Sequence, residues 1–157
     1  MTLMDIFDLP QRAEGNDLDA IPELQPQSDY TLRYLRERAL DGAVPVYFAA
    51  IPRDRIRPFD TAFDPANHPV GAAAVARTEA DWRAEIFPRV WVYPTHDAYV
   101  LSDDYIPWAA AQRAQPDYLP CWVLCYPSVA GAIYIEGPIG AARVRQLLQG
   151  SAETPAQ

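Results

Sequence analysis

Hydrophobic and polar residues alternate along this chain with two periods, one typical of strands and one typical of helices. Short apolar runs bounded by turn residues predict buried strands over residues 44–51, 89–94, 98–101, 121–126 and 130–137. Apolar stripes at helical spacing, with capping residues at their ends, predict helices over residues 28–42, 78–87, 102–114 and 138–149. This order of elements predicts an α/β fold of the α+β kind, in which several helices pack on a small mixed sheet.

The expected elements define one globular domain with less regular ends. Residues 1–27 contain three prolines and many acidic groups, which predicts an irregular arm whose expected anchors in a groove are Ile6, Phe7 and Leu9. Residues 28–150 form the domain, and residues 151–157 form a loose tail. We expect a long turn-rich loop over residues 53–73, and loops of that length inside compact domains often carry function.

The charge balance excludes one class of partner and favours another. The 157 residues carry a formal net charge of −8, and all 13 basic residues are arginine. Proteins that bind a nucleic-acid backbone need a basic face, so we expect no such binding. An acidic protein suits a protein partner, above all one with a basic face.

The apolar runs and the cysteines favour a cytoplasmic protein without a membrane partner. No apolar run approaches the roughly 20 residues of a membrane-spanning helix, and the first residues lack the basic region of a signal peptide. Cys121 and Cys125 would lie roughly 13 Å apart along a strand, which is too far for a disulfide. We therefore expect two buried free thiols.

Two acidic residues that could take part in catalysis or metal binding follow the predicted strand that ends at residue 101. Asp103 and Asp104 fit a metal site or a general acid/base pair, and they equally fit the N-cap of the next helix. His96 lies in the preceding hairpin turn, where we expect it to be close to both aspartates. His96, Asp103 and Asp104 are therefore a candidate site for a divalent cation.

Basic and aromatic residues complete the candidate pocket. Arg53, Arg55 and Arg57 follow one another at period two, so an extended segment would have one basic face. Such a face clamps a carboxylate or phosphate, or it pairs with the protein's own acids. The aromatic residues near the acidic turn fit either core packing or a binding surface. The pocket predicted from these patterns comprises Tyr99, Asp103, Asp104, Tyr105, Trp108, Arg55 and Arg57.

Four short sequence motifs follow one another along the middle of the chain. IPRDRIRP (residues 51–58) is similar to an I-x-x-I-x-P segment, and FPRVWVYP (87–94) is similar to a P-x-x-V strand. YVLSDD (99–104) is similar to a Y-x-(L/I)-x-D-G strand end, and LPCWVL (119–124) to a (V/I)-P-x-x-V strand. In these motifs, which cover about half the chain, the sequence resembles the ParB/sulfiredoxin-like superfamily, in particular the ParB N-terminal-like domain.

The resemblance implies a nucleotide whose phosphates are held at the start of a helix by backbone amides and basic side chains. In this sequence Asp104 stands at the family's glycine, both of the family's basic positions are apolar, Tyr105 takes the place of sulfiredoxin's cysteine, and Pro107 removes an amide donor. A phosphate there would face two carboxylates. At an effective dielectric near 20, one like-charge pair at ~4 Å amounts to about 4 kcal/mol of repulsion before solvation.

We therefore expect a non-enzymatic protein-binding or regulatory module on a ParB-like scaffold with a degenerate active site, such as a bacterial immunity-type inhibitor or adaptor, which needs no cofactor. Its expected contact surface is the acidic, aromatic-rich region around residues 93–108. The alternative is a divergent nucleotide-binding phosphotransferase or nuclease, with Mg²⁺ on Asp103 and Asp104 and phosphates on Arg55 and Arg57. A third interpretation is a subunit of a larger complex in which residues 1–27 become ordered.

Overall fold

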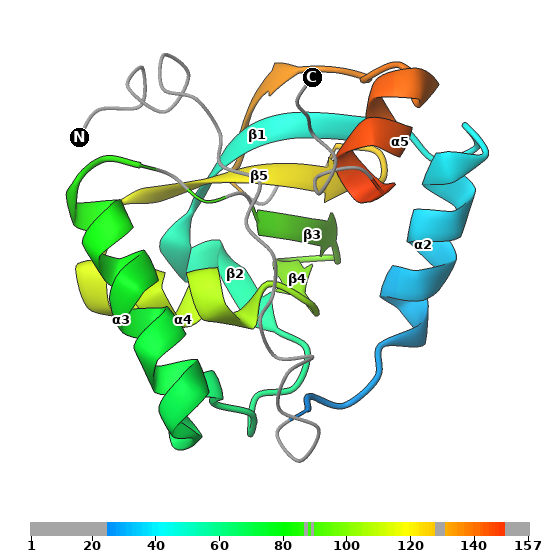
Figure 1. The fold of residues 1–157 in the computed structure, drawn as a ribbon. Coiled ribbons are helices and arrows are strands. Elements are labelled where there is room, and N and C mark those ends of the chain that lie inside the picture. Colours follow the sequence, from blue (N-terminus) through cyan, green and yellow to red (C-terminus); the bar gives the residue numbers. More distant parts are fainter. Residues whose placement is uncertain (1–24, 87, 89, 128–130, 150–157) are drawn as a thin grey trace, which may run out of the picture.

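The computed structural model describes residues 25–86, 88, 90–127 and 131–149 (Figure 1). The expected arm up to residue 24, with its proposed anchors, and the expected tail lie outside these residues. The described helices are α2 (Tyr30–Leu40), α3 (Pro69–Arg83), α4 (Tyr105–Ala114) and α5 (Ala141–Gln149), with 3-10 turns η2 (Arg53–Arg55) and η3 (Pro65–Asn67). The described strands are β1 (Val46–Pro52), β2 (Ile56–Pro58), β3 (Val90–Pro94), β4 (Tyr99–Leu101), β5 (Tyr118–Leu124) and β6 (Ile133–Glu136).

These strands form one mixed sheet in the order β2-β4-β3-β5-β1-β6. β1 pairs antiparallel with β5 and β6, and β3 pairs antiparallel with β4, whereas the pairs β2–β4 and β3–β5 are parallel. The hydroxyl oxygens of Tyr99 on β4 and Tyr134 on β6 are 2.8 Å apart, although three strands separate β4 from β6. The sheet therefore curls strongly without closing, and the predicted mixed α/β class is confirmed.

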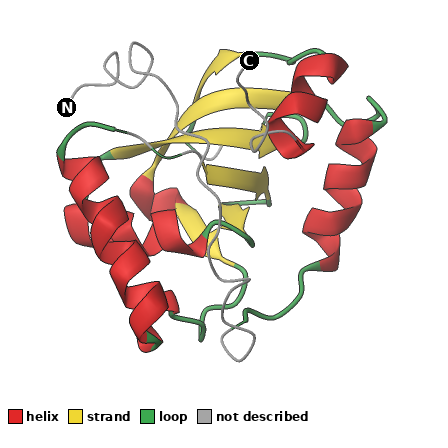
Figure 2. Cartoon of the chain, viewed as in Figure 1, coloured by secondary structure: helices red, strands yellow, loops and turns green. Residues whose placement is uncertain are grey.

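The helices pack in two pairs on opposite sides of the strands (Figures 1 and 2). In one pair, the indole nitrogen of Trp82 on α3 donates to the carbonyl oxygen of Pro107 on α4 at 3.2 Å. In the other pair, α2 lies beside α5, and the guanidinium of Arg143 on α5 sits 5.5 Å from the ring centre of Trp122 on β5. No described helix has the length and apolar character needed to cross a bilayer.

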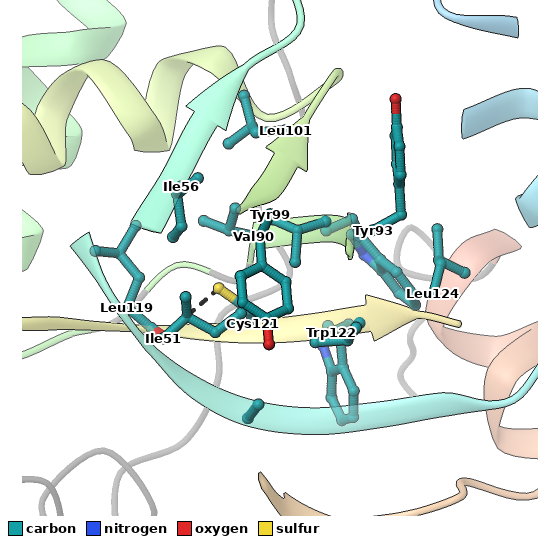
Figure 3. Packing of buried hydrophobic residues seen from close by; sticks show 14 of the residues in the cluster. Ile51, Ile56, Val90, Tyr93, Tyr99, Leu101, Leu119, Cys121, Trp122 and Leu124 are labelled. Carbon is teal, nitrogen blue, oxygen red and sulfur yellow. Dashed lines mark hydrogen bonds between the residues drawn. The ribbon is translucent and has the colours of Figure 1, made fainter. Parts of the chain in front are cut away.

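Strand alternation explains how the core is filled. Val90 on β3 lies opposite Cys121 on β5, and both are fully buried on one face of the sheet (Figure 3). The next residues, Trp91 and Trp122, point to the other face, where their ring centres lie 6.0 Å apart. Both described cysteines are free; Cys121 is buried and Cys125 is half-buried.

The prediction that the second long helix begins at Thr78 is wrong, because α3 begins at Pro69. His68 caps α3 by accepting from the Val70 amide, and Pro69 occupies the first turn, where proline is favoured. Thr78 lies inside the helix, where its hydroxyl donates to the carbonyl oxygen of Ala74 at 2.9 Å. A Cβ at Gly71 would lie 1.8 Å from the carbonyl oxygen of Pro65, so glycine allows η3 to pack against α3.

The prediction of a long loop over residues 53–73 is also wrong. It contains η2, β2, η3 and the first turn of α3. β2 has three residues, and its partner β4 is distant in sequence, so its alternation is too short to mark a strand. By contrast, the predicted helix end at Gly42 is confirmed, because Gly42 has a φ of 81° and follows the C-cap residue Asp41.

Candidate functional site

The acidic turn between β4 and α4 is held in place by the protein's own backbone. Asp104 is 7% exposed, and its carboxylate accepts from the amide of Trp91 on β3 at 2.7 Å. Asp104 is the N-cap residue of α4 but makes no capping hydrogen bond with its side chain. Of the two aspartates that fitted the N-cap in the sequence, Asp104 occupies that position and Asp103 does not. Asp104 joins the start of α4 to the sheet.

Helix α2 is attached to the same turn by two carboxylates. One oxygen of Asp29 caps α2 by accepting from the amides of Thr31 and Leu32. The other oxygen accepts from the Tyr93 hydroxyl at 2.8 Å and from the Ser102 hydroxyl. The guanidinium of Arg36 lies 2.7 Å from the carboxylate of Asp103. We call the contacts of Asp29, Arg36, Tyr93, Ser102 and Asp103 the α2 bridge.

The α2 bridge changes the acidity of one of its members. Burial removes water from Tyr93, and the bond to Asp29 fixes the phenol proton, so the pKa of Tyr93 is raised from 10.0 to about 12. Tyr93 is 8% exposed and Ser102 is 7% exposed. Both hydroxyls therefore depend on Asp29 rather than on water for their acceptor.

The aromatic residues predicted to line the pocket are mostly part of the core. Tyr99 is fully buried and bonds to Tyr134. Tyr105 is 1% exposed, and its hydroxyl accepts from the Asp60 amide at 2.9 Å. Burial also raises the pKa of Tyr105. The expected aromatic-rich surface around residues 93–108 is therefore wrong, because β3 and β4 are buried on both faces and Tyr105 lies on the buried side of α4. Trp108 is half-buried.

The predicted row of arginines on one face is also wrong. Arg53 and Arg55 belong to η2, and Arg57 belongs to β2, so they do not share one extended segment. Arg53 donates to the carbonyl oxygen of Pro116 at 3.1 Å. Arg55 and Arg57 are exposed, and no bond joins either side chain to another described residue. Arg55 precedes β2 whereas Asp103 follows the parallel strand β4, so the two lie at opposite ends of this pair.

His96 does not lie beside the acidic turn, as the sequence led us to expect. It is exposed in the turn that precedes β4, whereas Asp103 and Asp104 follow β4. Four residues from Ala98 to Ser102 span roughly 13 Å in an extended strand. Among the described residues, no three His, Cys, Asp or Glu side chains form a group that could hold a metal ion. Metal binding at Asp103 and Asp104 stays a prediction.

A cleft of about 360 Å³ lies between α4 and residues 58–65. Two of the predicted pocket residues, Tyr105 and Trp108, line it, together with residues that sequence reasoning missed: Phe63, Asp64, Gln112 and Arg113. The helical spacing of Trp108 and Gln112, four residues apart on one face, was the signal in the sequence. Phe63 had no such signal, because its ring meets Tyr105 only through the fold, with ring centres 5.0 Å apart.

The candidate site is thus divided between the closed α2 bridge and an open cleft on the other side of α4. In the bridge the carboxylates of Asp29 and Asp103 already have partners within the chain, whereas the cleft offers aromatic rings and polar side chains. Comparisons with protein-family models, with curated proteins and with solved structures find no match for this chain.

Proposed function

We propose that this protein is a non-enzymatic protein-binding or regulatory module, built on a ParB-like scaffold that has lost its phosphate-binding motif. One observation carries the proposal: the turn where a nucleotide would be held is covered by α2 through the α2 bridge. The acids at this turn already have partners within the chain. Asp103 is paired with Arg36, and Asp104 is bound to the backbone of β3.

Electrostatics supports the same proposal. A phosphate at this turn would have to displace Asp29 from Ser102, and it would then lie near three carboxylates, those of Asp29, Asp103 and Asp104. Each like-charge pair at ~4 Å opposes binding by about 4 kcal/mol at an effective dielectric near 20. The one cation of the bridge, Arg36, is engaged with Asp103.

The partner is expected to be a protein with a basic face, because the chain carries a net charge of −8 and complementary charge steers association. Two strongly exposed tyrosines lie on α2, where Tyr30 is 71% exposed and Tyr34 is 61% exposed; Tyr126, which is 67% exposed, lies outside α2. Tyrosine is enriched among residues that dominate binding energy. We place the contact on this face of α2. Arg33 and Arg38 stack on these two rings, so the acidic charge that steers a basic partner lies on the surrounding surface and the tyrosines supply the contact itself. A cytoplasmic location fits the free cysteines.

The first test asks whether nucleotides bind at all. The purified protein is heated with CTP, ATP, GTP or ADP, each with and without Mg²⁺. A ligand at 100 times its dissociation constant stabilises the fold by about 2.7 kcal/mol, which gives a clear rise in melting temperature. No rise is expected. A Mg²⁺-dependent rise that is lost in Asp103→Asn would refute the proposal, and this variant is suitable because Asp103 is 40% exposed.

The second test addresses the partner directly. A protein captured by this chain is purified, and its dissociation constant is measured at several salt concentrations. We expect binding to weaken with salt and to weaken about tenfold or more in Tyr30→Ala/Tyr34→Ala. The matched control is Tyr126→Ala, which removes another exposed tyrosine outside α2. Equal losses in both variants would contradict a contact on α2.

A further inference from the structure

The cleft beside α4 has two chemically different ends. Tyr105 lies in the first turn of α4 and Arg113 in the last, so the cleft follows the helix for about 12 Å at 1.5 Å per residue. At one end the rings of Phe63 and Tyr105 meet edge to face, next to the half-buried Trp108. At the other end lie Gln112 and Arg113.

The polar end carries hydrogen-bond donors that lack acceptors. The amide nitrogen of Gln112 is buried and has no hydrogen-bond partner, and a buried donor of this kind costs about 1 to 3 kcal/mol if it stays unpaired. The guanidinium of Arg113 is exposed, and no ion pair joins it to another described residue. A ligand that supplies acceptor oxygens at this end pairs with Arg113 directly, and with the amide of Gln112 once that side chain rotates into the cleft.

The remaining charge at the cleft limits where an anionic group can sit. Asp64 lies on the opposite wall, where one of its oxygens accepts from the Ala66 amide. An acidic ligand group is therefore favoured near Arg113 and disfavoured near Asp64. A neighbouring cleft of about 390 Å³ lacks this pattern, because its arginine, Arg83, is already paired with Glu79 at 2.8 Å.

We propose that this cleft binds a small ring compound that carries a carboxylate, with the ring against Trp108 and Phe63 and the carboxylate at Gln112 and Arg113. Trp108 and Gln112 are separated by about one helical turn, or roughly 5 to 6 Å. That spacing matches an aromatic or heteroaromatic ring joined to its carboxylate by a short aliphatic link. A volume of about 360 Å³ lies in the usual range for small-ligand sites.

This inference goes beyond the proposed protein-binding function and does not require it. The contact face proposed for a partner lies on α2, whereas the cleft lies along α4, on the opposite side of the sheet (Figure 1). Failure of a partner to bind leaves the cleft intact, and failure of the ring compounds to bind leaves the α2 face intact.

The test uses the purified full chain and three acids: phenylacetate, 3-phenylpropionate and indole-3-propionate. Each acid is compared with its primary amide by calorimetry, and the two phenyl acids also by tryptophan fluorescence, because indole-3-propionate itself fluoresces in the tryptophan range. Trp108 is the half-buried tryptophan, whereas Trp82, Trp91 and Trp122 are buried, so ligand in the cleft should quench Trp108. We expect saturable binding of at least one acid and about tenfold weaker binding of its amide, because a charge-assisted bond is lost.

Variants locate the binding within the cleft. Arg113→Gln should weaken the acid about tenfold and bring it close to its amide, and Asp64→Asn should tighten it. Arg33→Gln, which removes an exposed arginine of α2, should leave binding unchanged. Trp108→Ala should abolish the fluorescence response, with circular dichroism as the check that it folds. Absence of saturable binding at millimolar concentration, equal binding of acid and amide, or equal effects of Arg113→Gln and Arg33→Gln would each overturn the proposal.

Discussion

Asp29 gives the sharpest test of whether α2 is bound to the acidic turn as the structure describes. In Asp29→Ala the helix loses its N-cap, and the buried hydroxyls of Tyr93 and Ser102 lose their acceptor. These two effects have different physical origins, and a second substitution at Tyr93 separates the hydroxyl contact from the helix cap.

The expected loss follows from the contacts. A lost N-cap costs about 1 kcal/mol, and each buried hydroxyl left without its charged acceptor costs about 1 kcal/mol or more. Together these effects predict that Asp29→Ala lowers the free energy of unfolding by about 3 kcal/mol. That is a large part of the 5 to 15 kcal/mol typical of a domain, and it corresponds to a fall of about 10 °C in the melting temperature.

Urea denaturation followed by tryptophan fluorescence measures this loss, and a double-mutant cycle with Tyr93→Phe isolates the bridge. We expect a coupling free energy of about 1 kcal/mol between Asp29 and Tyr93. The matched control is Asp41→Ala, because Asp41 is 59% exposed and paired with Arg38, and exposed pairs contribute about 0 to 1 kcal/mol. A loss of 1 kcal/mol or less in Asp29→Ala, with no coupling to Tyr93, would refute the bridge as a stabilising contact.

Three further predictions use groups elsewhere in the core. The pKa of Tyr93 is raised to about 12 in the folded protein, so its contribution to the free energy of unfolding is present below pH 10 and is lost as pH rises toward 12. In urea titrations at high pH, Tyr93→Phe should reduce this fall of stability with pH, and an unchanged pH dependence would contradict the prediction. Gly71→Ala should lower the free energy of unfolding by about 3 kcal/mol. Gly140→Ala, whose new Cβ meets no atom within 4 Å, should lower it by less than about 1 kcal/mol. Similar melting temperatures of the two variants would contradict the close packing at Gly71. Burial raises the pKa of Cys121, so a thiol reagent should modify Cys125 alone in the folded protein, and rapid reaction of both thiols would count against the buried position.

Local patterns were enough to predict the elements with their own strong period. β1, β5, α2 and α4 all lie close to their predicted ranges, because each has a regular apolar face and recognisable ends. α3 was shortened in the prediction because its first half is rich in small residues, which give a weak stripe. β2 was missed because three residues are too few to show alternation, and its pairing with β4 depends on the tertiary fold.

The candidate site was harder to predict because its contacts join distant parts of the chain. Asp29 and Ser102 are 73 residues apart in sequence, and nothing in the sequence near Ser102 indicates that α2 covers it. His96 was expected beside the aspartates because the length of the strand between the two turns was neglected. β4 separates the turn that contains His96 from the turn that contains Asp103 and Asp104. β3 and β4 are apolar at nearly every position, which is typical of strands buried on both faces, and this pattern contained the signal that Tyr93 and Tyr99 are both buried.

The cleft and the α2 bridge are connected through a short series of hydrogen bonds. Tyr105 forms part of the aromatic end of the cleft, and its hydroxyl accepts from the amide of Asp60. The carboxylate of Asp60 accepts from the amide of Gln27 at 2.8 Å, two residues before Asp29 at the start of α2. A ligand that moves Tyr105 therefore acts on the segment that leads into the bridge. If a ligand in the cleft changes the affinity of α2 for a partner, reciprocity of the coupling free energy requires the partner to change the affinity of the cleft by the same factor.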